Sequence, residues 1–560
     1  MNVAPFSTDT IKPVFAAGAA FVFTRKGVYF RNNAASAMLE GEPAKELVRA
    51  LAPFLDGSHS LAELIAAVSE PKRAALQRIL NWLIERRIVI DAARGATLAA
   101  SGIPGDVAEY LASLGVSGVL ALRVHVAGDE EIAPLVTEAA RATGLRLETS
   151  SADADVVLYA GSAIDDAVAL ARRGLPLVSA LLRPPGAWVT SGCAECLVRR
   201  LAEHPSPHAA AADSLTSHYA AASLARTALH RLAGIATADV VVYDAAARIT
   251  ATHTLLPHPR CSLCAQWDAG WRLSFALRVS AAIPATPESR PRLETAEERT
   301  AELDPVVDDT LGPILRLHEE DFTQLPFSRS AALVVSAAGG TPVRFVASGL
   351  DYYESRLRAA TAALESYATS LSAAETDGLL WALRVPSLEP LLVPATAMFA
   401  PEVTTASGWD YEELLARAIL GAVLQGDVTP QGSLDVESLA SHRVPRLLRV
   451  AERLGINVDL RQARTRFDVP AVIATAGGRE TTATGMSLAD GAEEALLALL
   501  SSQCGPRVAA VTHPQTVSTR QLLDALDAAG AGGILIPHAA LPCRGRALLV
   551  AGFTWSGAGA

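Results

Sequence analysis

The chain has 560 residues, of which 50% are hydrophobic and 19% charged, so it is long and apolar enough to bury several cores. Its formal net charge of −11 disfavours a nucleic-acid partner, because phosphate binding needs a basic surface. The apolar run at residues 14–23 is too short to cross a bilayer, and the N-terminus lacks the basic-then-apolar order of an export signal. We therefore expect a cytoplasmic protein of about three to four domains that makes no membrane contact.

Residues 1–95 are predicted to form a small winged-helix unit. Two strands, Ala20–Thr24 and Gly27–Arg31, are rich in Val, Phe and Tyr and flank a short turn. A helix over Ala44–Leu55 follows them. A generic nucleic-acid-binding module has the same layout, but this segment has few cationic residues, which argues against that reading.

The second half of this unit carries a clear helix start. Ser60 and Glu63 have the spacing of a capping box, directly before the apolar run LAELIAAV. A third helix follows, with apolar side chains at helical spacing at positions 76, 79, 80 and 83. A strand over Ile88–Ile90 is expected to close the unit.

Residues 105–284 are predicted to form a Rossmann-like domain. Strands over Leu120–Val126, Asp155–Tyr159 and Leu175–Leu182, with a helix over Glu131–Thr143, have the rhythm of a doubly wound sheet. A nucleotide site would need glycines at the first turn, so that backbone amides approach the phosphate. The sequence there, VHVAGDEEIAP, has one glycine followed by carboxylates that repel phosphate. We therefore expect the scaffold without its nucleotide site.

Four cysteines form two Cys-x-x-Cys pairs, Cys193 with Cys196 and Cys261 with Cys264. Two such turns complete the closed tetrahedral thiolate shell that zinc prefers, and a closed shell is structural because it leaves no position for water or substrate. The metal would clip two distant segments together. In a reducing compartment paired cysteines favour a metal over disulfides. A redox dithiol stays the alternative for either pair taken alone.

Other thiols and histidines are interpreted as structural. Cys504 and Cys543 have no partner at metal-binding spacing and are expected to be buried thiols. His258 either replaces a cysteine as a ligand or shapes the turn beside it. The remaining histidines near the cysteine pairs are expected to face solvent on helices and not to form a second metal site; they lie at positions 204, 208, 218 and 230.

The second half of the chain is predicted to be a polar linker, residues 285–327, followed by a large α/β domain, residues 328–560. Its strands are expected at 332–336, 343–347, 458–460 and 471–474. Its helices are expected at 356–370, 411–424, 438–454 and 492–500. The expected fold class of the whole chain is therefore α/β multidomain.

The stretches LAPFLDGSHSLAELIAAV and ILNWLIERRIVI resemble the PqqD-like peptide-recognition element of ribosomal-peptide modification systems. The resemblance implies that this unit captures the leader of a precursor peptide, which adds a strand to a sheet edge beside a hydrophobic helix groove. The candidate binding residues, which are alternatively part of the core, are the edge-strand residues Val28, Tyr29 and Phe30 and the groove residues Leu76, Leu80 and Leu83.

The segments PPGAWVTSGCAECLVRRL and LPHPRCSLC resemble the cysteine-containing segments of ThiF-like proteins. With the N-terminal unit, this order is similar to the ThiF-like (ocin-ThiF-type) leader-binding partners of azoline-forming cyclodehydratases. Those partners belong to thiopeptide, bacteriocin and other thiazole/oxazole-modified peptide clusters, many of which make antibiotics. This chain departs from ThiF-like enzymes in having no adenylating motif and no cysteine placed as an acyl-transfer nucleophile.

Three C-terminal stretches resemble helices of the YcaO family, which activates amide oxygens with ATP: ASGLDYYESRLRAATAALESY, ASGWDYEELLARAILGAVLQGD and GMSLADGAEEALLALLSSQ. The resemblance implies that glutamates and an arginine on these helices hold magnesium and phosphates. Glu365 and Gln503 are kept. Other residues depart from the pattern where an acid or arginine is expected, namely Ala362, Ser366, Ala422, Gln425, Gly426 and Leu500. The resemblance is therefore to a degenerate YcaO-like domain.

Because such side chains cannot replace carboxylates on a hard cation, the resemblance predicts a non-catalytic component of a cyclodehydratase complex. The chain would bind the precursor leader and present Cys, Ser and Thr residues to a separate YcaO enzyme. Zinc would be its own structural metal, and ATP and magnesium would act only in that partner enzyme. No catalytic residue is assigned, and a homodimer is compatible with this role. Two alternatives stay open: a self-sufficient ATP-dependent YcaO cyclodehydratase and a ThiF-like adenylating enzyme.

Overall fold

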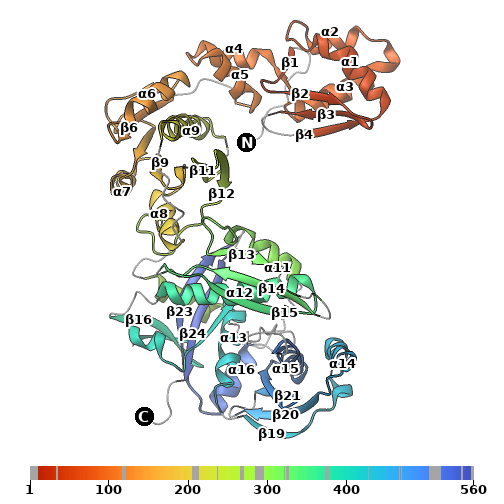
Figure 1. Cartoon of the computed structure of the whole chain (residues 1–560), viewed down its shortest axis with the longest axis vertical. Coiled ribbons are helices and arrows are strands. Elements are labelled where there is room, and N and C mark those ends of the chain that lie inside the picture. The colour runs from red at the N-terminus through yellow and green to blue at the C-terminus, as the bar shows by residue number, and fades with distance from the viewer. Residues whose placement is uncertain are drawn as a thin grey trace. The chain divides into compact units, whose positions relative to one another are not determined.

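The computed structural model describes residues 11–555 apart from 33–35, 117–121, 205–212, 236–237, 265–269, 284–294, 321, 323, 325–326, 338, 373–377, 427, 440, 466, 468, 503–518 and 544–546. The chain forms two compact units, which we call unit 1 (residues 1–194 and 207–252) and unit 2 (residues 195–206 and 253–560). Figure 1 labels their helices and strands. Each unit has its own hydrophobic cores and mixes helices with several sheets, so the α/β multidomain class is confirmed at this level.

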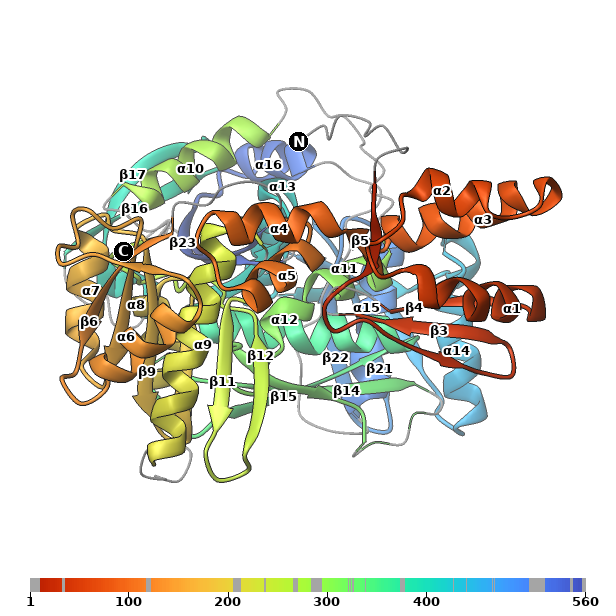
Figure 2. The same cartoon turned by 90° about the horizontal axis from the view of Figure 1, so that it is seen from above.

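The first part of unit 1 combines a three-stranded antiparallel sheet with three helices. The sheet has β3 (Gly27–Arg31) between β2 (Ala20–Phe23) and β4 (Ser36–Glu40). The helices are α1 (Glu42–Leu51), α2 (Leu61–Ala66) and α3 (Glu70–Glu85), and α1 lies along β3 (Figure 2). A second small sheet pairs β1 (Pro13–Phe15) with β5 (Val89–Asp91).

The predicted capping box at the start of α2 is confirmed. The Ser60 hydroxyl oxygen accepts the Glu63 amide at 3.2 Å, and the Glu63 carboxylate accepts the Ser60 amide at 2.7 Å. These reciprocal bonds satisfy two amides that the first helical turn leaves without an intrahelical partner. The helix start therefore follows directly from the local sequence.

The prediction that Val28, Tyr29 and Phe30 lie on an edge strand is wrong. Their strand, β3, pairs with β2 on one side and β4 on the other, so its backbone amides and carbonyls are already used in the sheet. The strands that can accept a further strand are the outer ones, β2 and β4.

The second part of unit 1 is built around a seven-stranded sheet in the order β12-β11-β10-β9-β8-β6-β7. Strands β6 (Arg123–Gly128), β7 (Arg146–Leu147), β8 (Val156–Gly161) and β9 (Leu177–Arg183) are parallel, as the alternating strand and helix pattern predicts. Strands β10 (Gly186–Thr190) and β11 (Val240–Asp244) continue the sheet antiparallel, and β12 (Ile249–His253) lies at its edge. The sequence analysis did not anticipate these last three strands.

Five helices accompany this sheet: α4 (Ala92–Ala100), α5 (Gly105–Ser113), α6 (Ala133–Ala142), α7 (Ile164–Arg172) and α9 (Ser214–Leu232). Helix α9 packs on β8, β9 and β10 and against α6. Its buried side chains are small or medium in size, mostly Ala and Leu with Ser223, Thr216 and Thr227, which lets the helix approach the sheet closely. The core of this part lies between α9 and the sheet.

Unit 2 contains three sheets. The first is β13 (Ile314–His318), β14 (Ser328–Val334) and β15 (Val343–Gly349). The second has the order β17 (Glu389–Pro394), β16 (Leu379–Val385), β23 (Gly533–Pro542), β24 (Ala547–Trp555) and β18 (Thr404–Gly408). The third is β19 (Val428–Ser433), β20 (Asp459–Thr465), β21 (Pro470–Ala476) and β22 (Arg479–Thr484).

The helices of unit 2 fill the space beside these sheets. They are α8 (Ala194–Glu203), α10 (Trp271–Ala282), α11 (Ala296–Glu302), α12 (Tyr352–Ser372), α13 (Tyr411–Val423), α14 (Arg443–Arg453), α15 (Leu488–Ser502) and α16 (Thr519–Ala528). Helix α12 packs on β13, β14 and β15 and also contacts β18 and β23, so it joins the first two sheets. It is buried on most of its circumference, which is the mark of a central helix.

The prediction of a polar linker over residues 285–327 is wrong for its described part. A capping box at Thr295 and Glu298 starts α11, and β13 pairs antiparallel with β14. Leu303, Val306 and Ile314 are buried in the same core as α12. The few apolar residues of this stretch therefore fold inward, while its many charged residues lowered the apparent hydrophobicity of the segment.

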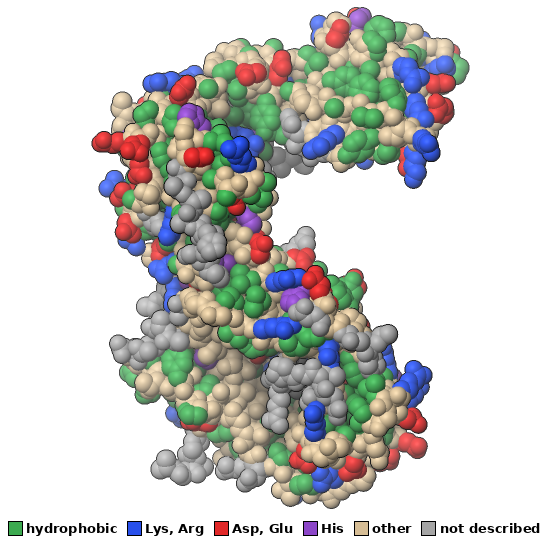
Figure 3. Space-filling model, in the orientation of Figure 1, with side chains coloured by type: hydrophobic (Ala, Val, Ile, Leu, Met, Phe, Trp, Pro, Cys, Tyr) green, Lys and Arg blue, Asp and Glu red, His purple; other side chains and the backbone are tan. Residues whose placement is uncertain are grey.

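The face drawn in Figure 3 shows no continuous basic patch among the described residues. On the face shown in Figure 3, lysine and arginine side chains are interspersed with aspartate and glutamate. Each helix in the part of the chain that the structure describes is too short or too polar to span a membrane.

One buried histidine in unit 2 makes stability depend on pH. His538, on β23, is 0% exposed, and neither ring nitrogen has a hydrogen-bond partner among the described residues. Burial, with a smaller contribution from the charge of Arg272, lowers the pKa of His538 to about 4. The unfolded chain binds a proton at about pH 6.5. The stability is therefore complete above that pH and is lost as the pH falls toward the folded-state pKa.

We predict that His538→Leu raises the free energy of unfolding at neutral pH by on the order of 1 kcal/mol, because no buried ring nitrogen then lacks a partner. The acid-dependent loss should also shrink, as measured by urea unfolding at about pH 7 and about pH 5. His218→Gln, at an exposed position on α9, is the control and should follow the parent protein. Parallel loss of stability in His538→Leu and the parent would contradict this account.

Candidate functional site

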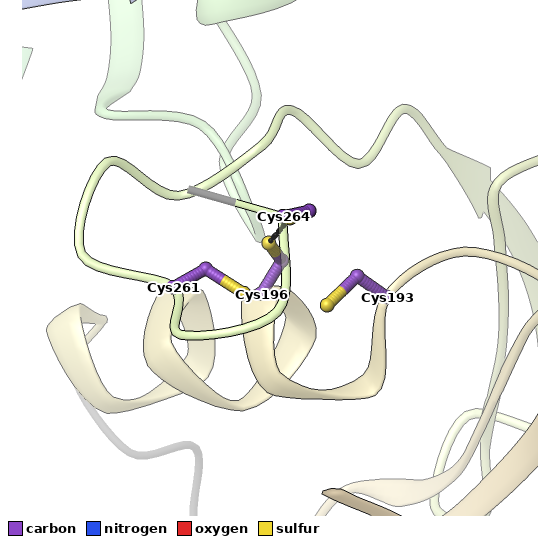
Figure 4. A group of neighbouring side chains, drawn as sticks. All are labelled: Cys193, Cys196, Cys261 and Cys264. Atoms are coloured by element: carbon purple, nitrogen blue, oxygen red, sulfur yellow. Dashed lines mark hydrogen bonds between the residues drawn. The ribbon is translucent and has the colours of Figure 1, made fainter. Parts of the chain in front are cut away.

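The four cysteines of the two predicted pairs come together. Cys193 and Cys196 lie at the start of α8, and Cys261 and Cys264 lie on a loop that faces it (Figure 4). Their sulfur atoms all lie within 4.8 Å of one another, and the Cys196 and Cys264 sulfurs are 3.0 Å apart. The structure assigns no disulfide bond between them. Residues 68 positions apart thus form one cluster.

The donor set of this cluster fits zinc. Four sulfur ligands arranged as two turns match the tetrahedral thiolate shell of structural zinc sites. Two backbone amides donate to the sulfurs, His258 N to Cys196 Sγ at 3.2 Å and Leu263 N to Cys261 Sγ at 3.4 Å. Such N–H···S bonds stabilise negative charge on sulfur, as a thiolate ligand requires.

His258 lies beside the cluster and is not one of its ligands. Its ring Nδ1 is 3.0 Å from the Arg260 amide nitrogen, which can only donate, so Nδ1 accepts. Nε2 then carries the proton and donates to the Glu203 carboxylate at 2.9 Å. Burial lowers the pKa of His258, although the Glu203 hydrogen bond opposes this effect. His258 therefore shapes the turn between the two cysteine segments.

The other thiols and histidines are scattered. Cys543 is half-buried, and Cys504 and His208 lie outside the described residues. His218 is exposed as expected, whereas His230 is half-buried and its ring Nε2 lies 2.8 Å from the Tyr110 hydroxyl. His204 is partly buried, and burial lowers its pKa.

A second group of potential ligands consists of His253, Asp308 and Asp309. The two Asp308 oxygens are already used: one accepts the Thr310 and Leu311 amides, and the other lies 2.8 Å from His253 Nδ1. This hydrogen bond raises the pKa of His253. The group is explained as a carboxylate that closes the turn before β13 and orients one histidine.

The six candidate peptide-binding residues are mostly in the core. Five are at most 1% exposed and belong to one buried cluster: Val28, Phe30, Leu76, Leu80 and Leu83. Tyr29 is 37% exposed and stands beside Val22 and Met38 on the neighbouring strands. Their role in peptide binding stays a prediction, in which the buried five shape the unit and Tyr29 supplies accessible surface.

The turn after β6 carries the Asp129 carboxylate. A nucleotide phosphate at this turn would need backbone amides as hydrogen-bond donors. Asp129 follows β6 directly, and its Oδ2 accepts the Ser162 amide at 3.0 Å. Gly128 has a φ of 122°, and a Cβ there would lie 1.9 Å from the Ala160 carbonyl oxygen. The backbone amide at the end of β8 is thus bound to a protein anion, which disfavours the adenylating alternative at this turn.

In unit 2 the helices that resemble YcaO helices carry buried carboxylates, and these are paired with arginines. Arg358 on α12 donates to Glu354 at 2.8 Å and to both oxygens of Glu494 on α15, at 2.7 and 2.9 Å. Burial alone would lower the pKa of Arg358, but the two carboxylates raise it. Arg443 on α14 also contacts Glu354, at 2.6 Å. These pairs fasten α12, α14 and α15 together.

Glu493 is the third carboxylate of this group. It lies 3.0 Å from Arg443, and burial raises its pKa to about 7. Two guanidinium groups serve three carboxylates here, so one acid retains a proton close to neutral pH. Glu493 is therefore able to give or take a proton under physiological conditions, a property that the sequence analysis missed.

Glu365, which the sequence analysis identified as kept from the YcaO pattern, is also engaged. Its carboxylate accepts the Ser407 hydroxyl at 2.6 Å and lies 3.5 Å from Arg417 on α13. Burial raises its pKa, against the opposing effect of Arg417. This acid therefore links α12 to β18, through Ser407, and to α13, through Arg417.

The described carboxylates do not fit the magnesium site that the resemblance to YcaO enzymes implies. Among the residues that the structure describes, the ligand groups of three or more are the cysteine cluster and the His253 group, and neither lies on α12, α13 or α15. Ala422 and Leu500 are buried apolar side chains, and Gln425 and Gly426 are exposed. Gln503 lies outside the described residues.

Neither the protein-family models nor the curated proteins gave a match to this sequence. Two solved structures match nearly the whole chain. A heterocyclase described as in complex with substrate and cofactor is 14% identical, with a TM-score of 0.61 over 98% of this chain and 95% of that one. The heterocyclase TruD is 13% identical, with a TM-score of 0.57 over 98% of this chain and 94% of that one. At these identities the likeness shows the fold.

The YcaO protein of Methanopyrus kandleri bound with AMPPCP and Mg2+ covers 48% of this chain at 14% identity, with 92% of that chain covered and a TM-score of 0.34. A score this low supports no argument. The two whole-chain matches are therefore the informative ones.

These matches overturn the expectation of a non-catalytic partner that serves a separate enzyme. Both whole-chain matches are described as heterocyclases, so the domain order that was assigned to a partner protein occurs within heterocyclase chains. The error has a physical source. The expected acids were judged by linear position on three helices, whereas the buried acids Glu354 and Glu494 lie at other positions of α12 and α15. The alternative of a self-sufficient cyclodehydratase is the better supported one.

The buried ion pairs of α12 yield a stability prediction. We expect Arg358→Met to lower the free energy of unfolding of unit 2 by about 3–5 kcal/mol, because it leaves buried carboxylates without their guanidinium partner. Arg316→Met is the matched control, since its pair with Glu320 is exposed and should change stability by less than about 1 kcal/mol. Denaturant unfolding measures both, and equal effects would refute the account.

Proposed function

We propose that this chain is itself a heterocyclase, an ATP-dependent cyclodehydratase that closes azoline rings on Cys, Ser or Thr residues of a ribosomal precursor peptide. The single observation that carries the proposal is the fold likeness over 98% of the chain to a heterocyclase described as in complex with substrate and cofactor. Ring closure joins a side-chain thiol or hydroxyl to the carbon of the preceding amide and releases water.

The N-terminal part of unit 1 is proposed to hold the precursor leader. Strands β2 and β4 are the outer strands of this sheet among the described residues, and an extended peptide can add to an outer strand through backbone hydrogen bonds. Tethering the substrate on the same polypeptide raises the local concentration of the core residues around the ring-closing site. Recognition and chemistry would thus belong to one chain.

The acids of α12, α13 and α15 do not assemble the expected magnesium site, so the proposal rests on the fold and not on a nucleotide constellation. What this chain's own residues offer is a set of buried carboxylates with raised pKa values. Glu493 is able to exchange a proton near neutral pH, and burial raises the pKa of Glu365. Such groups suit the proton transfers that the loss of water requires.

The reaction is tested with the purified full chain, ATP, Mg2+ and the precursor peptide encoded beside its gene. We expect binding of the labelled peptide by fluorescence anisotropy, followed by loss of the mass of one water per ring and by ATP hydrolysis. Glu365→Gln should lower the turnover by at least about 100-fold, because an amide cannot transfer a proton. Glu320→Gln, at an exposed position, should leave the turnover unchanged.

Absence of both ATP hydrolysis and water loss, with bound precursor and folded protein, would overturn the proposed activity. Equal turnover of Glu365→Gln and the parent would instead remove Glu365 from the chemistry and leave the activity standing. Binding without chemistry that is restored by an added second enzyme would show that the fold has lost its activity.

We also propose that the four cysteines bind one structural zinc ion, which would be held by Cys193, Cys196, Cys261 and Cys264. The four sulfurs within 4.8 Å and the amide donors to them support this assignment. Free thiols in such a cluster suit a reducing cytoplasm, which we propose as the location.

Metal analysis of the purified chain is expected to find about one zinc per chain. Cys261→Ser should lose most of this zinc and lower the thermal midpoint of unfolding, because Cys261 is 0% exposed within the cluster. Cys543→Ser is the matched control at a thiol outside the cluster and should keep its zinc. A zinc-free parent protein, or a Cys261→Ser variant with full zinc content, would refute the site.

A further inference from the structure

Helix α8 presents one buried face that carries more than the metal ligand. Cys196, Arg200 and Glu203 follow each other at intervals of four and three residues, so they share a side of the helix. Their exposed fractions are 1%, 1% and 4%. Buried charged side chains require partners. Since α8 belongs to unit 2, those partners come from the same unit.

One buried partner of Glu203 is Tyr367 of α12. The Tyr367 hydroxyl lies 2.8 and 2.9 Å from the two Glu203 carboxylate oxygens, 164 residues away in sequence. Arg200 Nη1 donates to the same hydroxyl at 2.7 Å, and its guanidinium lies over the Tyr367 ring at 5.7 Å from the centroid. Tyr367 is itself 1% exposed. These contacts fix α8 against α12.

Another buried partner of Glu203 is His258, which lies beside the cysteine cluster. Its Nε2–H donates to Glu203 at 2.9 Å, while its backbone amide donates to Cys196 Sγ at 3.2 Å. The orientation of this residue therefore determines both bonds. A continuous chain of contacts runs from Tyr367 through Glu203 and His258 to the sulfur of a cysteine in the cluster.

Helix α12 is the element that joins two sheets of unit 2, and Glu365 lies two residues before Tyr367 on it. Glu365 in turn binds Ser407 at the end of β18. A displacement of Tyr367 would therefore act on the stretch of α12 that carries Glu365. Outer contacts that orient metal ligands are commonly worth a factor of about 10 to 100 in metal affinity.

We propose that Glu203 and Tyr367 are positioning residues that couple the cysteine cluster to helix α12, so that the bound metal stabilises the packing of α12 in unit 2. The inference rests on the proposed zinc site and is independent of the proposed ring-closing activity. It predicts that loss of one hydroxyl on α12 weakens metal retention at sulfurs that this hydroxyl does not touch.

The test compares the zinc-loaded full chain with its Tyr367→Phe variant, which removes the hydroxyl and keeps the ring. We expect zinc transfer to a chromogenic chelator to become about tenfold faster. Glu203→Gln should have a similar effect, and the double variant should be no faster than the single ones, because both changes break the same connection. Tyr352→Phe, at an exposed position on the same helix, is the control.

A second readout separates coupling from simple loss of stability. The thermal midpoint is measured with and without zinc for each variant. Coupling predicts that Tyr367→Phe reduces the increase in midpoint that zinc produces. Equal lowering of both midpoints together with unchanged zinc release overturns the inference, while a parent protein without zinc overturns the zinc site on which it rests.

Discussion

The burial of charge along helix α12 is the constraint on which the rest of unit 2 depends. A carboxylate taken out of water is costly unless a guanidinium or several donors accompany it. Arg358 of α12 meets this requirement for Glu354 and for Glu494, and the second contact binds α12 to α15. The Tyr367 hydroxyl of α12 donates to Glu203 and so binds α12 to α8. Helices far apart in sequence are therefore held in one register by paired charges as well as by apolar packing.

The cysteine cluster is connected to α12 by the same kind of buried polar contact. Judged by sequence order, the two cysteine pairs belong to the segment that forms the seven-stranded sheet. In the structure, Cys196, Cys261 and Cys264 belong to unit 2, together with α12. A metal at these sulfurs would stabilise unit 2. The buried Glu203 connects the cysteine cluster to α12, because it contacts both His258 and Tyr367.

The expected non-catalytic role rested on single residues in three helices, whereas the proposed activity rests on the fold of the whole chain. Single residues at 362, 422 and 500 suggested a fold without activity, while the whole chain shares the fold of two heterocyclases, on which the proposed activity rests. Both observations concern the same helices. The pair Arg358–Glu354 follows from i,i+4 spacing on α12. The contacts of Glu494, Glu365 and Glu354 with arginines of α12, α13 and α14 cross between helices, and no spacing rule within one helix could have assigned them. The raised pKa of Glu493 likewise arises from burial against neighbours remote in sequence.

The sequence by itself determined the local elements and the grouping of the cysteines. Helical periodicity located α3, α12, α13 and α15, and the capping box placed the start of α2 within one residue, because these signals act over a single turn. The spacing of the cysteines was enough to group them. Tertiary structure alone decided that β3 is a central strand, that residues after 295 join a core, and that β23 and β24 complete a sheet with β16 and β18. Strand pairing and charge pairing depend on contacts between residues distant in the chain, and a local pattern contains no record of them.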